Sequence, residues 1–379
     1  MFAPIRALVS LRRGAPVALI VGASAVSFLF AATPFLIPEV ADRFGVSLGT
    51  AGLISSVQVL GFAVSVFVAG RRLSPSRSGL VVAALTGVAC DSASALVASF
   101  PALLGLRLAA GAAAGLLTWL AWADAMRSPR SMRDVAAVGP LTVLVAAPLL
   151  AWVASAGGDR AVYLLLAGSM VFPAIVPVHF LSEPMRGRRK MSPSRSNLVL
   201  LAGLGILTMA GSALFVFLGA FAELKAGLTA VGMSIGFSVN ALAGLIGARL
   251  RWRPHHAWPW LVLVAGSAAS IVLFPGAPAY YIGMFGWGFA FWMAVPTVLG
   301  RVVEWSLAPD ERVGDAQSVM ALGRAAGPSV AAVLVGNGKF GGLAVFAGTG
   351  LLTSAGVVGG VEMYRRGRPS PVVALDGPS

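Results

Sequence analysis

Charged residues are scarce in this chain, and cysteine is almost absent. Only 11% of the 379 residues are Asp, Glu, Lys or Arg, whereas 58% are hydrophobic. An ordinary soluble domain is about 25% charged, so a soluble globular enzyme is excluded. The high apolar content also excludes a disordered chain. Because Cys90 is the single cysteine, no disulfide can form within the chain, and a disulfide-stabilised secreted scaffold is excluded.

Signatures of nucleotide and metal chemistry are also missing. The sequence has no Gly-x-x-x-x-Gly-Lys-Ser/Thr loop, so we do not expect ATP hydrolysis by this chain. His255 and His256 are adjacent, but no further metal ligands lie near them in the sequence. We therefore expect no metal site and no cofactor. A clustered set of catalytic residues is not evident either, and we predict that the chain is not an enzyme.

Long apolar runs make up most of the sequence. A helix needs about 20 apolar residues to cross the hydrocarbon core of a membrane. The runs are rich in Gly, Ala and Ser, which let membrane helices approach closely. We predict an all-α membrane protein with twelve transmembrane helices, at residues 16–38, 49–69, 79–98, 101–123, 135–156, 161–181, 197–221, 228–249, 257–274, 279–303, 314–335 and 342–363.

The basic residues indicate how these helices are oriented. If the N-terminus is cytoplasmic and the helices alternate, 22 of the 28 Lys and Arg residues lie on the cytoplasmic side. This bias is the one expected for membrane proteins. It explains the net charge of +14 by topology, so we expect no nucleic-acid partner. We predict a multi-pass protein of the cytoplasmic (inner) membrane, with both termini in the cytoplasm.

The two halves of the chain resemble each other. Gly111 follows Pro101 by ten residues, and Gly288 follows Pro278 by the same interval. Further matches share an offset of 180 residues: Leu48 with Leu228, Gly52 with Gly232, Arg71 with Arg251, and Pro148 with Pro328. We predict an N-terminal six-helix bundle at 1–181, a basic cytoplasmic linker at 182–197, and a C-terminal six-helix bundle at 198–379. Two parallel repeats are typical of transporters whose substrate site lies near the membrane midplane.

Three motifs resemble those of the major facilitator superfamily. Residues 107–115 (RLAAGAAAG) resemble its Arg-x-x-x-Gly motif in the fourth helix, and residues 308–314 (APDERVG) resemble its Pro-x-x-Arg-x-Gly loop. Residues 148–163 resemble the antiporter motif of the fifth helix, although most of its glycines are replaced. The loop after the second helix keeps its arginines but lacks the family's aspartate. The resemblance implies alternating access by two six-helix bundles. The pattern is nearest to the drug/proton antiporter branch, which implies multidrug-type efflux of a small amphipathic molecule by a monomer.

Two charged residues are expected at the same depth in the membrane. Asp91 and Arg107 are each eight residues from Ser99, the centre of a short connection between antiparallel helices. At 1.5 Å per residue both lie about 12 Å from the surface, so they could form an ion pair. Asp91 would then be a proton-coupling carboxylate with Arg107 as its partner. Alternatively the pair is static, or Arg107 binds carbonyls of the first helix while Asp91 faces elsewhere.

Other polar and aromatic residues are candidates for substrate binding and gating. Side chains near the midplane are polar or aromatic at Gln58, Trp119, Asn240, Trp287, Trp292 and Arg324. The two amides bind either substrate or a neighbouring helix, and the tryptophans line either a cavity or the lipid interface. Arg324 is either an anion ligand or a packing residue. Asp124 could pair with Arg71 or Arg72 as an inner gate.

Two functions remain open from the sequence. The first is proton-coupled export of a small amphipathic molecule, supported by the deep carboxylate Asp91 and the aromatic helices 101–123 and 279–303. The second is uptake or exchange of a small organic anion, with Arg324 and Arg107 as its ligands. Replacing Arg324 by Gln should abolish the second function but not efflux of neutral or cationic compounds.

Overall fold

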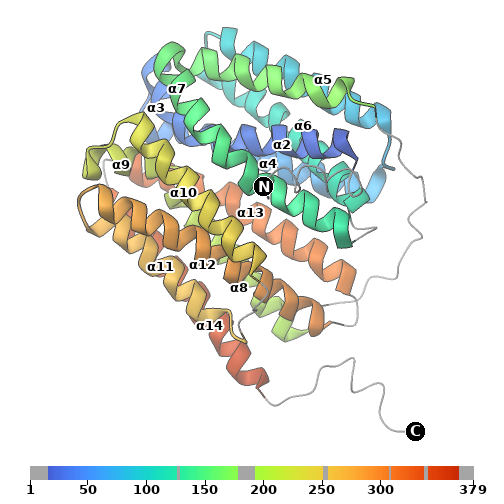
Figure 1. The fold of residues 1–379 in the computed structure, drawn as a ribbon, viewed down its shortest axis with the longest axis vertical. Helices are drawn as coiled ribbons and strands as arrows, with labels where there is room; N and C mark the ends of the chain where they lie inside the picture. The colour runs from blue at the N-terminus through green and yellow to red at the C-terminus, as the bar shows by residue number, and fades with distance from the viewer. Residues whose placement is uncertain are drawn as a thin grey trace, which may run out of the picture. The chain divides into compact units, whose positions relative to one another are not determined.

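The computed structural model describes residues 16–125, 129–177, 193–250, 255–306, 309–336 and 340–366, and its regular elements in these ranges are all helices (Figure 1). The chain divides into two compact units, here called the N-terminal unit (Met1–Met185) and the C-terminal unit (Arg186–Ser379). The boundary lies within the predicted linker 182–197, most of which is outside the described residues.

The N-terminal unit contains α2 to α7, coloured blue to green in Figure 1. Their bounds are α2 Val17–Ala31, α3 Thr33–Phe44, α4 Leu48–Arg72, α5 Arg77–Leu96, α6 Phe100–Ala125 and α7 Pro129–Ile175. The C-terminal unit contains α8 Arg195–Phe215, α9 Leu218–Ala226, α10 Ala230–Arg249, α11 Trp258–Leu273, α12 Ala277–Glu304, α13 Pro309–Gly336 and α14 Phe340–Arg365.

Within the described residues, nine helices are long and apolar enough to cross a membrane, or ten if the bent pair α2–α3 is one span. The prediction of twelve differs at two places. The predicted span 135–156 and residues 161–175 of the predicted span 161–181 fall in the single helix α7, whose apolar stretch of 39 residues would be about 58 Å long. Gly158 has non-helical dihedral angles inside it (φ 64°, ψ −162°), and this break divides α7 into two lengths. The predicted ninth span is α11, an apolar helix of 16 residues.

The first predicted span, 16–38, is not one straight helix. It breaks at Ala32, where α2 and α3 meet at an angle of 49°, and it continues to Phe44. Pro34 lies in the first turn of α3. A proline has no N–H and its ring clashes with the preceding turn, which favours a kink at this point. The predicted span 197–221 is also divided, because α8 ends at Phe215 and α9 begins at Leu218.

Helix ends show that the two units repeat the same local structure. Gly45 ends α3 in the left-handed conformation (φ 61°), and the Ser47 side chain then accepts a hydrogen bond from Thr50 N at the start of α4. In the C-terminal unit Gly227 ends α9 (φ 62°), and Thr229 caps α10. A left-handed glycine followed by a capping hydroxyl is a strong helix-boundary signal. The equivalent residues of the two units are 182 positions apart, so the offset of 180 predicted for helices α4 and α10 is wrong by two residues.

A second repeated contact joins α4 to α6 and α10 to α12. A Cβ on Gly111 would collide with the backbone oxygen of Gln58, and a Cβ on Gly288 would collide with the backbone oxygen of Asn240. Glycine is required at both positions because the helix backbones touch there. The predicted Pro–Gly pairing of the two halves therefore corresponds to an equivalent helix crossing.

Candidate functional site

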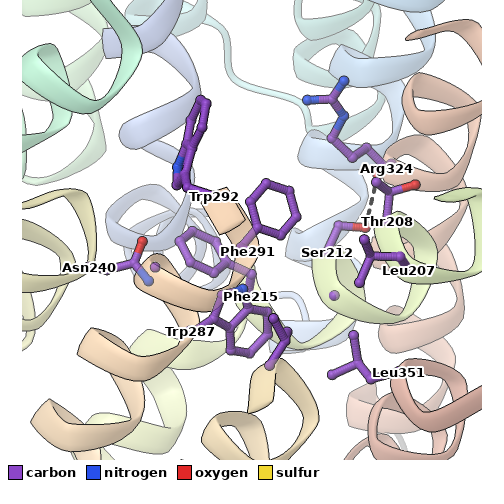
Figure 2. Close-up of a pocket in the computed structure, with 13 residues that line it drawn as sticks. Leu207, Thr208, Ser212, Phe215, Asn240, Trp287, Phe291, Trp292, Arg324 and Leu351 are labelled. Atoms are coloured by element: carbon purple, nitrogen blue, oxygen red, sulfur yellow. Dashed lines mark hydrogen bonds between the residues drawn. The ribbon is translucent and has the colours of Figure 1, made fainter. Parts of the chain in front are cut away.

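A cavity of about 240 Å³ lies within the C-terminal unit and is here called the aromatic pocket (Figure 2). Helices α8, α10, α11, α12, α13 and α14 contribute its walls. The thirteen lining residues are Leu207, Thr208, Gly211, Ser212, Phe215, Asn240, Val264, Trp287, Gly288, Phe291, Trp292, Arg324 and Leu351.

Four aromatic side chains form much of the pocket wall. Trp287 and Phe291 are four residues apart, which places them on one face of α12, and Trp292, the next residue, is turned toward α10, where its ring lies against Gly244. Phe215 from α8 meets the Trp287 ring edge to face, with centroids 5.8 Å apart. Trp287 is 5% exposed, so it lies inside the protein and not at the lipid interface. Such rings offer flat, apolar surfaces to a ligand.

The polar groups of the pocket come from three other helices. Asn240 on α10 donates from Nδ2 to the backbone oxygen of Met284 on α12, at 2.8 Å. Thr208 and Ser212 lie one turn apart on α8. Arg324 on α13 is exposed, and Figure 2 shows its guanidinium group on the side of the aromatic cluster opposite Asn240. The pocket therefore combines an apolar centre with polar groups at its edges, which is the usual composition of a small-molecule site.

The structure brings together four of the six predicted substrate residues: Asn240, Trp287, Trp292 and Arg324. Gln58 and Trp119 belong to the N-terminal unit and do not line this pocket. Gln58 is 4% exposed, and its Nε2 has no hydrogen-bond partner in the described part of the chain. Trp119 packs against α4, with its Nε1 3.8 Å from where a Cβ on Gly70 would stand.

Sequence reasoning missed the contribution of α8 to the pocket. Thr208, Ser212 and Phe215 follow the spacing i, i+4, i+7, which places them on one face of a helix. This spacing was available in the sequence. It had no meaning until the neighbouring helices were known, because membrane helices are apolar on all sides.

The predicted pair of Asp91 and Arg107 is present in the N-terminal unit. Arg107 Nη2 lies 2.7 Å from Asp91 Oδ1, and both side chains are fully buried. The same nitrogen donates to Ser94 Oγ at 2.7 Å and to the backbone oxygen of Cys90 at 3.3 Å. The Tyr163 ring, on α7, lies 4.7 Å from the guanidinium carbon. The alternative in which Asp91 faces away from Arg107 is therefore wrong.

The buried pair keeps unused hydrogen-bonding capacity. Asp91 Oδ2, Arg107 Nε and Nη1, and the Tyr163 hydroxyl are buried and have no partner in the described ranges. Arg107 thus binds the carboxylate through a single nitrogen, not through the two-nitrogen fork that arginine often uses. One carboxylate oxygen remains free to accept a proton while the other keeps its contact with Arg107.

A second arginine holds the C-terminal end of α5. Arg43 on α3 forms an ion pair with Asp159 at 2.7 Å and donates to the backbone oxygens of Ser94, Ala95 and Val97. These carbonyls are left unpaired at a helix end, where a positive charge is also favourable. Ser94 joins the two arginines, since its hydroxyl contacts Arg107 and its carbonyl contacts Arg43.

The predicted inner gate is not formed by the groups that the structure describes. No ion pair links Asp124 to the described side chain of Arg72, and the Arg71 side chain lies outside the described residues. His256 faces Glu362, with Nδ1 3.6 Å from Oε2. Across the described residues, no group of three or more His, Cys, Asp or Glu side chains could hold a metal ion.

Comparisons with known proteins agree with this architecture. The sequence model of the Major Facilitator Superfamily matches residues 19–332. A chloramphenicol resistance protein of Streptomyces lividans is 26% identical over 345 residues, which cover 80% of this chain and 84% of that protein.

Solved structures show the same fold at low identity. The human organic anion transporter MFSD10 (TETRAN) gives a TM-score of 0.64 at 18% identity, over 96% of this chain and 99% of that one. A POT family transporter in complex with 5-aminolevulinic acid gives a TM-score of 0.67 at 12% identity, over 94% and 96% of the two chains.

Proposed function

Because the chain belongs to the Major Facilitator Superfamily, we propose that this transporter exports a small amphipathic molecule in exchange for protons. The chain is a multi-pass membrane protein and not an enzyme. The mechanism that fits two repeated units is alternating access, in which the binding pocket opens to one side of the membrane and then to the other. The distribution of basic residues supports placement in the cytoplasmic membrane with both termini inside the cell.

The aromatic pocket is the observation that carries this proposal. Its volume of about 240 Å³ suits a small ligand, and its lining mixes aromatic rings with a few polar groups. A flat apolar molecule with polar substituents would bury its rings against Trp287, Phe291 and Trp292, which excludes water from them. The related chloramphenicol resistance protein makes chloramphenicol the first substrate to test.

Asp91 is the residue proposed to carry the coupled proton. It is fully buried, and an ionisable group at membrane depth marks a functional site by default. Its free oxygen, Oδ2, could accept a proton while Oδ1 stays on Arg107. Protonation would remove the negative charge that holds Arg107, and this loss would bias the packing of α5 against α6 toward another arrangement.

The test uses purified protein in liposomes that are loaded with chloramphenicol. A proton gradient should drive drug movement by the wild type, and Asp91→Asn should lose this gradient-driven transport while keeping drug exchange in the absence of a gradient. Asp159→Asn is the matched control, because Asp159 on α7 also pairs with an arginine, Arg43, which binds the C-terminal end of α5. Gradient-driven transport by Asp91→Asn equal to the wild type would show that Asp91 does not couple protons.

The pocket is tested separately by Trp287→Ala. Loss of the ring should raise KM for the transported molecule by about tenfold, which corresponds to about 1.4 kcal/mol of binding. Trp152→Ala serves as control, since Trp152 is 64% exposed on α7 and belongs to the other unit. An unchanged KM in Trp287→Ala would place the substrate elsewhere.

A further inference from the structure

The aromatic pocket contains one charged side chain and no side chain of opposite charge. Arg324 is the sole charged residue among the thirteen that line it, and none of them is Asp or Glu. An organic cation would meet aromatic ring faces, which attract it. It would also meet the guanidinium group of Arg324, whose like charge repels it. The charge of the lining therefore disfavours cations.

The hydroxyl groups of the pocket already use their hydrogens. Thr208 Oγ1 donates to the backbone oxygen of Leu204 at 2.9 Å. Ser212 Oγ lies 3.3 Å from the backbone oxygen of Met209 and 3.4 Å from that of Arg324. Each hydroxyl has a single hydrogen, so neither is a free donor for a ligand.

Arg324 keeps most of its donor capacity for a ligand. Its Nε donates to the backbone oxygen of Met320, one turn earlier on α13, at 3.3 Å. Its two terminal nitrogens form no hydrogen bond with the described residues, and the side chain is exposed. The indole N–H groups of Trp287 and Trp292 can only donate. The pocket thus offers a ligand donors around one strong positive charge.

Asn240 provides an acceptor on the opposite side of the aromatic cluster. Its Nδ2 contacts the Met284 carbonyl, and a carbonyl can only accept a hydrogen bond. This contact fixes the amide so that Oδ1 points elsewhere, and the hydrogen bond of the Asn240 side chain to the described residues is made through Nδ2. Figure 2 shows Asn240 and Arg324 separated by Phe291 and Trp292.

We infer that the pocket selects an aromatic molecule with an acidic or strongly accepting group directed toward Arg324 and a hydrogen-bond donor directed toward Asn240, and that it discriminates against organic cations. The inference rests on the proposed function, because it takes this pocket as the substrate site. A cavity of about 150 Å³ holds benzene, so a volume of about 240 Å³ suits two fused rings.

Three ligands with the same ring system test the charge preference: 2-naphthoate, 2-naphthamide and 2-naphthylmethylammonium. Their binding to the detergent-purified full chain is measured by calorimetry. The expected order of affinity is the acid, then the amide, then the ammonium. Since a hydrogen bond to a charged group contributes about 1.5–3 kcal/mol, the acid should bind about tenfold or more tightly than the ammonium.

Variants assign this preference to Arg324. Arg324→Gln should reduce the affinity for 2-naphthoate to that for the amide, and the affinity for the ammonium should stay the same or increase. Arg324→Lys should retain part of the preference for the acid. Arg249→Gln is the matched control, because Arg249 is an exposed arginine of the same unit, at the end of α10. Equal thermal unfolding of the variants shows that they are folded.

A hydroxylated ligand tests the second end of the pocket. The compound 6-hydroxy-2-naphthoate carries a donor at the end of the rings remote from the acid, and it should bind more tightly than 2-naphthoate to the wild type. Asn240→Leu should remove this gain. Equal binding of both compounds to the wild type overturns the role of Asn240.

The failure of this inference is distinguishable from that of the proposed function. If the ammonium binds as tightly as the acid, or if Arg324→Gln leaves their ratio unchanged, the inferred selectivity is wrong. Gradient-driven transport, its loss in Asp91→Asn and the higher KM of Trp287→Ala would still stand. If none of the three compounds binds, the inferred ligand class is wrong, and the chloramphenicol transport assay decides the proposed function independently.

Discussion

A fully buried arginine is stable only while its charge remains compensated. Arg107 is fully buried, and it depends on Asp91, Ser94 and the Tyr163 ring for that compensation. Removing water from both charges costs several kcal/mol per ion, and their attraction offsets that cost only while both are present. The ion pair is therefore better evidence that each charge must occupy its position than that the pair stabilises the fold.

Removing one member of this pair should destabilise the N-terminal unit strongly. We expect Asp91→Leu to lower the free energy of unfolding by about 3–5 kcal/mol, because it leaves Arg107 buried without a counter-charge. The double variant Asp91→Leu with Arg107→Leu should recover most of that loss. Thermal unfolding in detergent measures both. A double variant as unstable as the sum of the single variants would show that the two side chains do not interact.

At the scale of helices, the packing depends on a few glycines where backbones touch. Gly288 on α12 faces the carbonyl of Asn240, and Gly111 on α6 faces that of Gln58. The two contacts are equivalent in the two units, although the surrounding side chains differ. A glycine at such a crossing allows the two helices to approach closely, and in the C-terminal unit Gly288 also lines the aromatic pocket.

Substituting Gly288 tests this crossing directly. Gly288→Ala should lower the free energy of unfolding by about 1–3 kcal/mol, as expected when a well-packed contact is overfilled, and should weaken ligand binding. Gly300→Ala on the same helix is the control, because a Cβ there meets nothing within 4 Å. Since alanine favours the helix by up to about 1 kcal/mol, this variant should not lower the free energy of unfolding. The measurement is thermal unfolding with and without 2-naphthoate. Equal behaviour of the two variants would mean that α10 and α12 do not touch at Gly288.

At the scale of the whole molecule, the property to be measured is the orientation of the chain in the membrane. The predicted orientation rests on the excess of basic residues in alternate loops. Many of those loops, including residues 178–192, lie outside the described residues, so orientation must be measured chemically. Cys90 is buried (8% exposed) and is the sole cysteine, so the chain suits a labelling experiment.

We expect cysteines placed on the two sides to differ in accessibility. In a Cys90→Ala background, Arg160→Cys should react with a membrane-impermeant maleimide in intact cells, whereas Arg188→Cys should react only after the cells are opened. The control is the cysteine-free background, which should not react in either state. Labelling of Arg188→Cys in intact cells would reverse the predicted orientation.

Only the tertiary structure showed that the side chains of Asp91 and Arg107 pair. The sequence alone determined the class of protein, the approximate positions of the helices and the shared depth of these two residues. It could do so because these features depend on composition, helix length and distance along the chain, which are local quantities. Tertiary structure decided which side chains share a pocket. It joined Asn240, Trp287, Trp292 and Arg324 with Thr208, Ser212 and Phe215 in one pocket of the C-terminal unit, whereas Gln58 and Trp119 belong to the N-terminal unit. In a membrane helix that is apolar all round, no periodicity marks the face that packs inward, so the face is chosen by close contacts such as Gly288 against Asn240. The bend at Ala32 between α2 and α3 is likewise a feature that hydropathy does not register, whereas the break at Gly158 falls between the predicted spans 135–156 and 161–181.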